Sequence, residues 1–325
     1  PYSDYEGSNE AIFALTGIMK MIGEVDQPPT IPRGFHPQIL GGLSAFNGAL
    51  SFLIAKAEDS KRGIKTSNFR IDASIFEANM YLTELGALTC YNNVPELGRM
   101  GINRFFPTYP LGIWPCKNGW LGVTVLSPAQ WHAFCKLLGL QDLAAVERYG
   151  SSAKRLEDVD IIEPRILEAL ANHCAEDLFY KGQQMRIPLA RVPTMTEVFG
   201  VDQYIHRKAF STITDGEFSF KAPSQPVRLF DTPPKFGGTV AELGAHTSDW
   251  ISLKSHELRN KDETSIKPSE LPLNGLTIID LGMGWAGPLA ARNLADLGAT
   301  VIKVEGCVRF DWFRNWEASQ EWIDD

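Results

Sequence analysis

The sequence predicts an α/β protein, with a Rossmann-like large domain built on a parallel sheet and a smaller α+β domain. Three observations carry this prediction. A strand, a glycine-rich turn, a helix and a second strand follow one another within 273–306. Helix-like and strand-like segments alternate over the first hundred residues. A stretch rich in Gly, Pro and aromatic residues at 92–120 breaks both periodicities, which indicates a crossing between domains.

Length and composition bound the classes of function. A chain of 325 residues allows two or more domains. A net charge of -8 argues against nucleic-acid partners and against an anionic membrane surface. The five cysteines have no C-x-x-C spacing, and neither His132 nor His173 has a partner at metal-ligand spacing, so no metal is predicted. With no signal peptide apparent and reduced thiols expected, we predict a cytoplasmic location.

The expected elements of the first part follow from periodicity. Residues 8–22 have the pattern of an amphipathic helix. The apolar run at 40–57 is interrupted by serines and an asparagine and is shorter than the ~20 residues of a membrane span, so we expect a buried helix and no membrane partner. The alternation in SNFRIDASIF, residues 67–76, predicts a strand, and 77–91 a helix.

The second part has its own pattern. WLGVTVL at 120–126 predicts a strand, and Ser127 followed by Pro128 predicts the start of a helix over 127–140. Another helix is expected over 160–182, and strands near 186–199 and between the prolines of 218–234. The chain is therefore expected to divide into five parts. Residues 1–100 are the later part of a large domain, 101–185 a small α+β domain, 186–251 a return to the large domain, 252–272 a polar linker and 273–325 a βαβ unit.

The glycine turn carries the clearest chemical signal. Gly282, Gly284 and Gly287 spell G-x-G-x-x-G between the strand-like TIID and the helix-like PLAARNLADLG. Such glycines let the backbone approach a ligand, and the helix start favours a phosphate group. NAD is one interpretation, but few residues follow Gly287, and Trp285 is bulky where a pyrophosphate would approach. Coenzyme A, which also carries phosphates, is the other.

The stretch PLNGLTIIDLGMGWAGPLAARNLADLGATVIKVEG, residues 272–306, resembles the beginning of the family III CoA-transferases, the group that contains formyl-CoA transferase, carnitine CoA-transferase and α-methylacyl-CoA racemase. Segments 5–30, 41–82 and 106–139 resemble later parts of the same family, and the segments RIPLARVPTMTEVF, APSQPVRLFDTPP and LGAHTSDWI resemble its end. This order implies a window across a tandem protein, with 1 to about 250 from one repeat and 273–325 from the next. A circular permutant is the alternative.

The resemblance implies the substrates and the chemistry. Acyl-CoA and a carboxylic acid would be the substrates, with no covalently bound cofactor, and an aspartate would form an acyl anhydride and then a thioester. Here Pro37 or Gln38 occupies the position of that aspartate, and neither is a nucleophile. His36 is a candidate general base, with a loop histidine without a chemical role as the alternative, and Glu77 is expected to be structural. This chain alone is therefore expected to be inactive.

Two other functions remain open, an acyl-CoA racemase or lyase of the same superfamily and a repeat that contributes only structure. For coenzyme A, the resemblance implies binding by the turn and the following strand, and Arg309 or Arg314 could reach the phosphates because Gly306 stands where some relatives have arginine. The residues implied in the turn and strand are Gly284, Trp285, Ala286, Gly287, Pro288 and Lys303.

The orphan βαβ unit also suggests an assembly. It cannot bury both of its faces alone, so we expect TIIDL and TVIKV to form parallel strands in a sheet shared with the strand near SNFRIDA. That docking would occur within the chain or between chains. A homo-oligomer or an intramolecular pairing of the repeats is therefore expected.

Overall fold

The computed structural model describes residues 4–64, 70–83, 98–235, 241–249, 251, 271–306 and 311. The chain divides into two compact units. Unit 1 contains Pro1–Ile22, Pro29–Leu97 and Glu257–Asp325, and unit 2 contains Gly23–Pro28 and Gly98–His256. The predicted linker at 252–272 lies, up to residue 270, outside the described residues.

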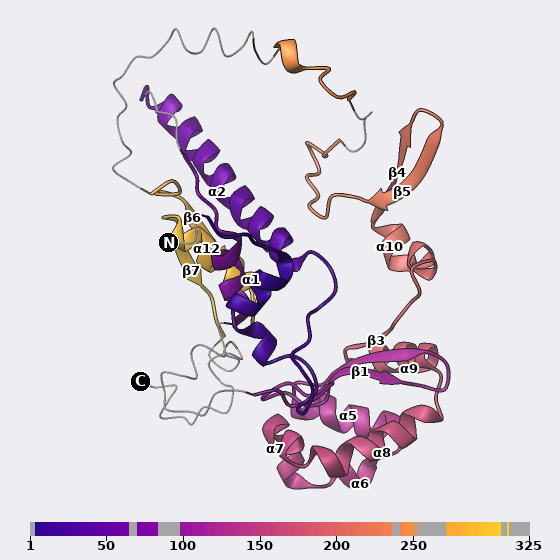
Figure 1. The fold of residues 1–325 in the computed structure, drawn as a ribbon. Helices are drawn as coiled ribbons and strands as arrows, with labels where there is room; N and C mark the ends of the chain where they lie inside the picture. The colour runs from indigo at the N-terminus through magenta and orange to yellow at the C-terminus, as the bar shows by residue number, and fades with distance from the viewer. Residues whose placement is uncertain are drawn as a thin grey trace. The chain divides into compact units, whose positions relative to one another are not determined.

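The N-terminal part of unit 1 is helical. Its elements are α1 (Asn9–Leu15), η1 (Ile18–Lys20), α2 (His36–Lys61), α3 (Ile75–Met80) and η2 (Tyr81–Thr83) (Figure 1). The helix predicted over 8–22 ends at Leu15 because Gly17 takes the left-handed conformation, with φ of 79°. Helix α2 begins before residue 40, since Pro37 has no N–H and suits a first helical turn.

Two expectations for this region are wrong. Residues 70–74 form no strand, because the Ser74 hydroxyl accepts from the Glu77 N–H at 3.2 Å and caps a helix that starts at Ile75. The described residues therefore contain no sheet shared between this segment and the C-terminal unit. The helix expected at 40–57 forms, but it is mostly exposed instead of buried. Of the 18 consecutive residues of α2 with the highest hydropathy, only 11% are buried.

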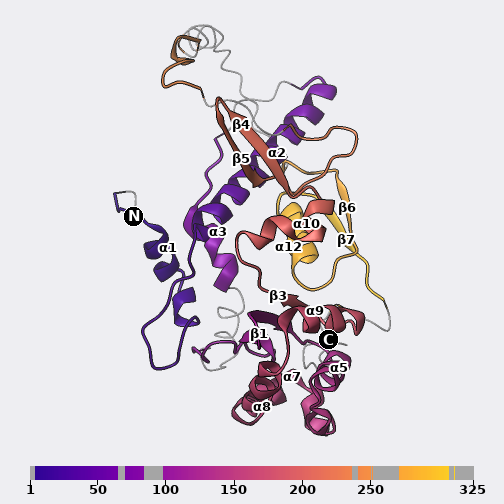
Figure 2. The same cartoon turned by 90° about the vertical axis from the view of Figure 1, so that its right-hand side faces the viewer.

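The C-terminal part of unit 1 is a βαβ unit. Strands β6 (Thr277–Asp280) and β7 (Thr300–Lys303) pair in parallel, and α12 (Ala286–Asp296) connects them. Figure 2 shows α12 beside both strands. The turn from α12 into β7 needs Gly298, because φ is 107° and a Cβ there would lie 2.5 Å from Leu271 Cβ. The predicted parallel pairing of TIIDL with TVIKV is confirmed.

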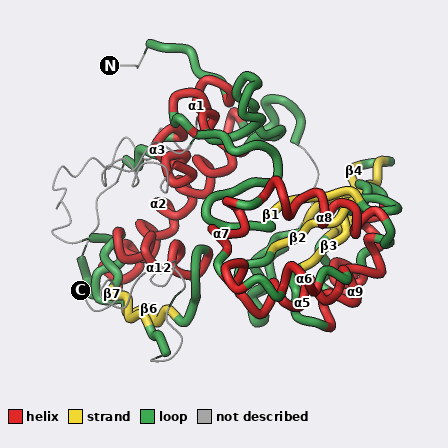
Figure 3. The backbone as a smooth tube through the Cα atoms, turned by 90° about the horizontal axis from the view of Figure 1, so that it is seen from below, coloured by secondary structure: helices red, strands yellow, loops and turns green. Residues whose placement is uncertain are grey.

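Unit 2 contains an antiparallel sheet of β1 (Leu111–Pro115), β2 (Trp120–Thr124) and β3 (Leu189–Arg191). Figure 3 shows this sheet among helices, which are α5 (Pro128–Leu138), α6 (Gln141–Ala144), α7 (Ser152–Glu157), α8 (Val159–Ala171) and α9 (Ala175–Gln184). The predicted start of α5 is confirmed, because Ser127 and Gln130 form a capping box. Buried aromatic and aliphatic side chains from the sheet and helices form one core.

Two differences in unit 2 have local causes. The helix predicted over 160–182 is interrupted between α8 and α9, where Asn118 Oδ1 accepts from the Ala175 N–H at 3.1 Å. A short helix α10 (Asp202–His206) and a hairpin of β4 (Phe210–Asp215) and β5 (Phe218–Pro223) follow β3. Strand β4 was not predicted. The domain boundaries given above stay predictions.

Arg155 lies fully buried in the core of unit 2, and no salt bridge joins it to a carboxylate among the described residues. Its Nε and Nη1 donate to the carbonyls of Tyr109 and Tyr149 at 2.7 and 2.6 Å, and its guanidinium carbon lies 4.9 Å from the centre of the Trp131 ring. Burial lowers the pKa of Arg155 to about 10, so the side chain stays charged at neutral pH. Its role is to satisfy main-chain acceptors inside the core.

Candidate functional site

The glycine turn between β6 and α12 folds closely onto itself. A Cβ on Gly282 would lie 2.9 Å from Gly287 Cα and 2.9 Å from Asp280 Oδ1, and a Cβ on Gly287 would lie 2.9 Å from Gly282 Cα. Gly284 has a φ of 74°, in the left-handed region. All three glycines of the motif are therefore required by the shape of the turn itself.

Carboxylates hold this turn from inside. Asp280 Oδ1 accepts from the Gly282 N–H at 2.7 Å. The Gly284 N–H lies 3.0 and 3.1 Å from the two carboxylate oxygens of Asp311, and the Asp311 N–H donates to Glu305 Oε2 at 2.9 Å. Asp280 and Asp311 are only 7% and 5% exposed. One turn amide that could face a ligand anion is thus already bound to a carboxylate of the chain.

Lys303 connects these groups. Its Nζ donates to the Gly282 carbonyl at 2.6 Å and to Asp311 Oδ2 at 3.0 Å, and it lies 3.2 Å from Asp280 Oδ2. Burial opposes the charged form, but the hydrogen bonds and charges of Asp311 and Asp280 outweigh it and raise the pKa of Lys303 above 10.5. Lys303 is therefore an ammonium ion at neutral pH that neutralises two buried carboxylates.

The structure brings most of the predicted coenzyme A residues together. Trp285 is the N-cap of α12, and Ala286, Gly287 and Pro288 form its first turn, beside the Lys303 cluster. Arg309 and Arg314 lie outside the described residues. Binding of coenzyme A by these residues stays a prediction. Asp311 was missed, because a single aspartate in a stretch without clear periodicity gives no signal before the fold places it against Gly284.

The structure gives the residues at the start of α2 structural contacts. Pro37 is buried, and its carbonyl accepts from Asn79 Nδ2 at 3.2 Å. Gln38 is exposed, and His36 Nε2 lies 2.9 Å from the carbonyl oxygen of Arg33. Glu77 lies in the first turn of α3. Among the described residues, no group of three or more His, Cys, Asp or Glu side chains could hold a metal ion.

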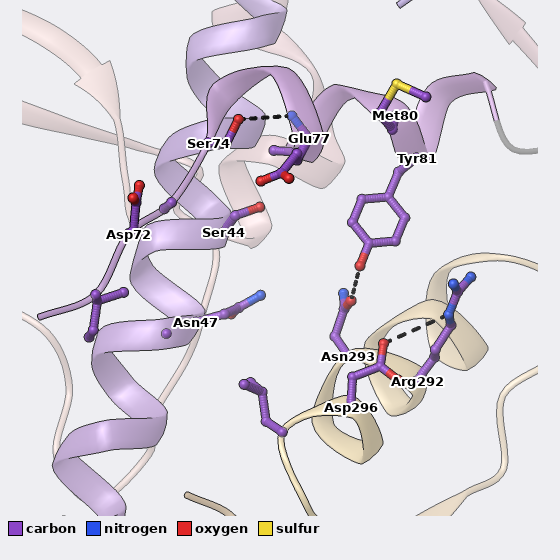
Figure 4. A pocket seen from close by; sticks show the side chains of 15 residues that line it. Ser44, Asn47, Asp72, Ser74, Glu77, Met80, Tyr81, Arg292, Asn293 and Asp296 are labelled. Carbon is purple, nitrogen blue, oxygen red and sulfur yellow. Dashed lines mark hydrogen bonds and ion pairs between the residues drawn. The ribbon is translucent and has the colours of Figure 1, made fainter. Parts of the chain in front are cut away.

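A pocket of about 700 Å³ lies elsewhere in unit 1, between α2, residues 71–81 and the C-terminal half of α12. Figure 4 shows Tyr81 and Asn293 pointing toward one another across it, with Tyr81 Oη donating to Asn293 Oδ1 at 2.9 Å. Arg292 lies over the Tyr81 ring, 5.8 Å from its centre, and its Nε lies 3.9 Å from Asp296 Oδ2. The pocket is at the opposite end of α12 from the glycine turn and was not predicted.

A family model described as CoA-transferase family III matches residues 1–247 and 273–324. The chain belongs to this family. A protein of Mycobacterium tuberculosis described as "Probable CoA-transferase Rv1866" is 24% identical over 328 residues, which cover 97% of this chain and 39% of that protein. The Succinyl-CoA--D-citramalate CoA-transferase of Chloroflexus aurantiacus is 23% identical over 79% of this chain and 64% of its own length. The chain thus spans less than two thirds of either relative.

Solved structures agree on the fold. A CaiB/BaiF family protein from Brucella suis matches with a TM-score of 0.62 and 20% identity, over 78% of this chain and 64% of that one. Rv3272 from Mycobacterium tuberculosis matches with a TM-score of 0.62 and 15% identity, over 76% of this chain and 64% of that one. The predicted α/β fold class and the resemblance to family III are both confirmed.

Proposed function

We propose that the protein to which this chain belongs transfers coenzyme A between carboxylic acids. The observation that carries the proposal is the family match, which covers both parts of the chain. Acyl-CoA and a carboxylic acid are then the substrates, with no covalently bound cofactor. The predicted cytoplasmic location fits such substrates and stays a prediction.

The reaction requires a protein carboxylate. A carboxylate oxygen attacks the thioester carbonyl, the carbon–sulfur bond breaks, and the coenzyme A thiolate leaves behind an acyl anhydride on the protein. The thiolate then attacks the protein side of that anhydride, which releases the acyl group as a carboxylate and forms a protein thioester. The acceptor carboxylate then takes coenzyme A from this thioester by the same steps in reverse, which restores the free protein carboxylate.

We propose that the start of α2 does not supply this carboxylate, and that the first repeat supports a catalytic partner. The Pro37 carbonyl is used by Asn79, and Gln38 carries a neutral amide that cannot attack an acyl group. This arrangement favours the structural role over the racemase or lyase, because His36 faces a main-chain carbonyl. The catalytic carboxylate would then belong to another repeat.

The order of the two matched segments supports a tandem protein. The family model matches two separate segments, 1–247 and 273–324. The second segment forms the strand–turn–helix–strand unit that resembles the family's beginning, although it follows the first in this chain. The Tyr81–Asn293 hydrogen bond joins the two segments within unit 1. We propose that 273–325 begins a second repeat and packs against the first.

Intact-mass analysis tests the missing nucleophile. The chain is incubated with an acyl-CoA donor, treated with or without hydroxylamine, and digested, with a family member that retains the aspartate as positive control. We expect no acyl or coenzyme A adduct within residues 30–45. A hydroxylamine-sensitive adduct on that peptide that is lost in Gln38→Ala would overturn the assignment of Gln38 as inert, and one that persists in Gln38→Ala would place a nucleophile elsewhere in residues 30–45.

Calorimetry tests the ligand separately. The intact protein should bind coenzyme A and not NAD, and the 325-residue chain should bind coenzyme A more weakly than the intact protein. Binding of NAD at micromolar concentration without binding of coenzyme A would refute the proposed function whatever the adduct experiment shows.

A further inference from the structure

Two cysteines that are far apart in the sequence lie close together in unit 2. Cys116 directly follows β1, in the turn that leads into β2, and Cys174 is the N-cap residue of α9. Both are free thiols, and both side chains are partly buried. Because the two positions have no C-x-x-C spacing, only the fold reveals the pair.

Main-chain contacts hold the two segments against each other. The Lys117 N–H donates to the His173 carbonyl at 3.0 Å. Each of these groups belongs to the peptide bond that directly adjoins one of the two cysteines. Asn118 and Cys174 also form a parallel backbone bridge. A single pair of hydrogen-bonded peptide groups therefore separates the Cα atoms of Cys116 and Cys174.

This hydrogen bond limits the distance between the two cysteines. Standard bond lengths and the 3.0 Å separation place their Cα atoms within roughly 8 Å of each other. Disulfides join Cα atoms that are about 4.4–6.8 Å apart, so at most a small backbone shift is needed. The turn can make that shift, because Lys117, Asn118 and Gly119 are exposed at the end of the β1–β2 hairpin.

The side chains of the two cysteines also interact. Cys116 packs against the core of unit 2, to which α9 contributes Leu178 one helical turn after Cys174. Burial and, second, the neighbouring Cys174 raise the pKa of Cys116 above its ordinary value. Both side chains remain partly exposed, whereas Cys135 is fully buried. A small oxidant can therefore reach this pair but not Cys135.

We propose that Cys116 and Cys174 are a redox modification site, at which a hydroperoxide converts the two thiols into a reversible disulfide. The Cys174 sulfur attacks one peroxide oxygen, the oxygen–oxygen bond breaks, and the thiol proton leaves with the other oxygen as water. The Cys116 sulfur then attacks the resulting sulfenic acid, which forms the S–S bond and releases a second water with the Cys116 proton. Cys174 reacts first, because burial disfavours the thiolate of Cys116.

The disulfide would tie the β1–β2 turn to the start of α9. The chain between the two cysteines contains β2 and helices α5 to α8, and a cross-link that closes a loop of this size restricts the unfolded chain. Oxidised unit 2 should therefore resist unfolding better than reduced unit 2. The site is independent of the proposed transfer of coenzyme A, because the glycine turn belongs to unit 1.

Peptide mapping measures the pairing. After the folded chain is treated with hydrogen peroxide and its remaining thiols are alkylated, trypsin should release residues 105–117 joined to residues 166–181. Dithiothreitol should separate the two peptides. Cys135→Ser is the matched control and should give the same joined product. Cys90→Ser/Cys307→Ser removes the two cysteines that lie outside the described residues, and the product should persist in it.

Single substitutions measure the order of the steps and the consequence. In Cys116→Ser the sulfenic acid on Cys174 lacks its partner thiol, so dimedone should trap about tenfold more of it than in the wild type. Oxidation should shift the urea midpoint of the wild type upward, and this shift should be absent in Cys116→Ser. Excess peroxide that yields no joined peptide, or equal yields from the folded and the urea-unfolded chain, would overturn the proposal. A dimedone adduct on Cys116 instead of Cys174 would overturn the order.

Discussion

Replacing Lys303 with methionine should destabilise the glycine turn while leaving the residues of the turn themselves unchanged. The substitution keeps most of the apolar stem and removes the ammonium group. That group lies 2.6 Å from the Gly282 carbonyl, 3.0 Å from Asp311 and 3.2 Å from Asp280. The two carboxylates, 7% and 5% exposed, would then lose the Lys303 ammonium group in a nearly buried site.

The magnitude follows from that burial. Breaking a buried ion pair by removing one partner costs about 3–5 kcal/mol, and breaking an exposed one costs about 0–1 kcal/mol. The Lys303 side chain is 24% exposed, so in the variant water can solvate the two carboxylates in part and reduce the cost of removing the ammonium group. We therefore expect a local loss of about 2–3 kcal/mol, because the carboxylates are the more buried partners.

Amide hydrogen exchange is the assay. The amides of β6, α12 and β7 should exchange about 30- to 150-fold faster in Lys303→Met than in the wild type, since each 1.4 kcal/mol corresponds to about tenfold. Lys303→Arg keeps the positive charge, so the exchange rates of these amides should rise much less than in Lys303→Met. Lys154→Met, which removes an exposed i,i+3 partner of Glu157 in unit 2, should leave this region unchanged. Equal exchange in Lys303→Met and the wild type would refute the proposed role of the ammonium group.

The same reasoning gives a pH dependence. Because the folded-state pKa of Lys303 is raised above 10.5, its contribution to stability is fully present below that value. It is lost as the pH rises through the folded pKa. The difference in exchange between the wild type and Lys303→Met should therefore persist from neutral pH up to about pH 10 and narrow only at more alkaline pH. A difference that disappears near neutral pH would contradict the assignment.

Three other changes test separate features. Gly282→Ala should abolish coenzyme A binding by the intact protein in calorimetry, because its Cβ would lie 2.9 Å from Gly287 Cα; unchanged affinity would exclude the turn from the site. Tyr81→Phe removes the hydrogen bond to Asn293 and should lower the free energy of unfolding of unit 1 by about 1 kcal/mol in urea titration; no change would mean that this contact contributes nothing. Cys135, whose pKa burial raises to about 12, should resist iodoacetamide at pH 8 until unfolded, and alkylation of the folded chain would contradict its burial.

The sequence predicted what depends on local signals. Ser127 and Pro128 mark the start of α5 correctly because capping is decided within one turn. The parallel pairing of 277–280 with 300–303 was predictable because strand, glycine turn and helix follow in the order of a βαβ unit. The strand expected at 67–76 does not form in the described part of that segment, 70–76. A serine cap at Ser74 starts a helix there, and alternation over a few residues does not reveal that competition.

The candidate site was predicted only in part, for a related reason. The glycines and the first turn of α12 are contiguous in sequence, so their proximity is visible there. Asp311 reaches Gly284 across 27 positions, and its partner Lys303 lies on a strand that only folding brings beside Asp280. Long-range polar contacts of this kind depend on tertiary placement, which residue spacing does not encode.

Helix α2 shows that composition can predict a helix correctly and still predict its burial wrongly. The run at 40–57 is apolar around most of its circumference, and such a helix is expected to be buried. In this chain the face of α2 that carries Gly41 is packed against α3, while the large apolar side chains of Ile39, Leu43, Phe46, Leu50 and Leu53 are between 44% and 59% exposed. Composition gives the number of apolar side chains on a helix but not which of them meet a neighbouring element. The close approach of α3 depends on Gly41, where a Cβ would lie 2.8 Å from Ile75 Cγ1, and such a contact is decided by tertiary structure.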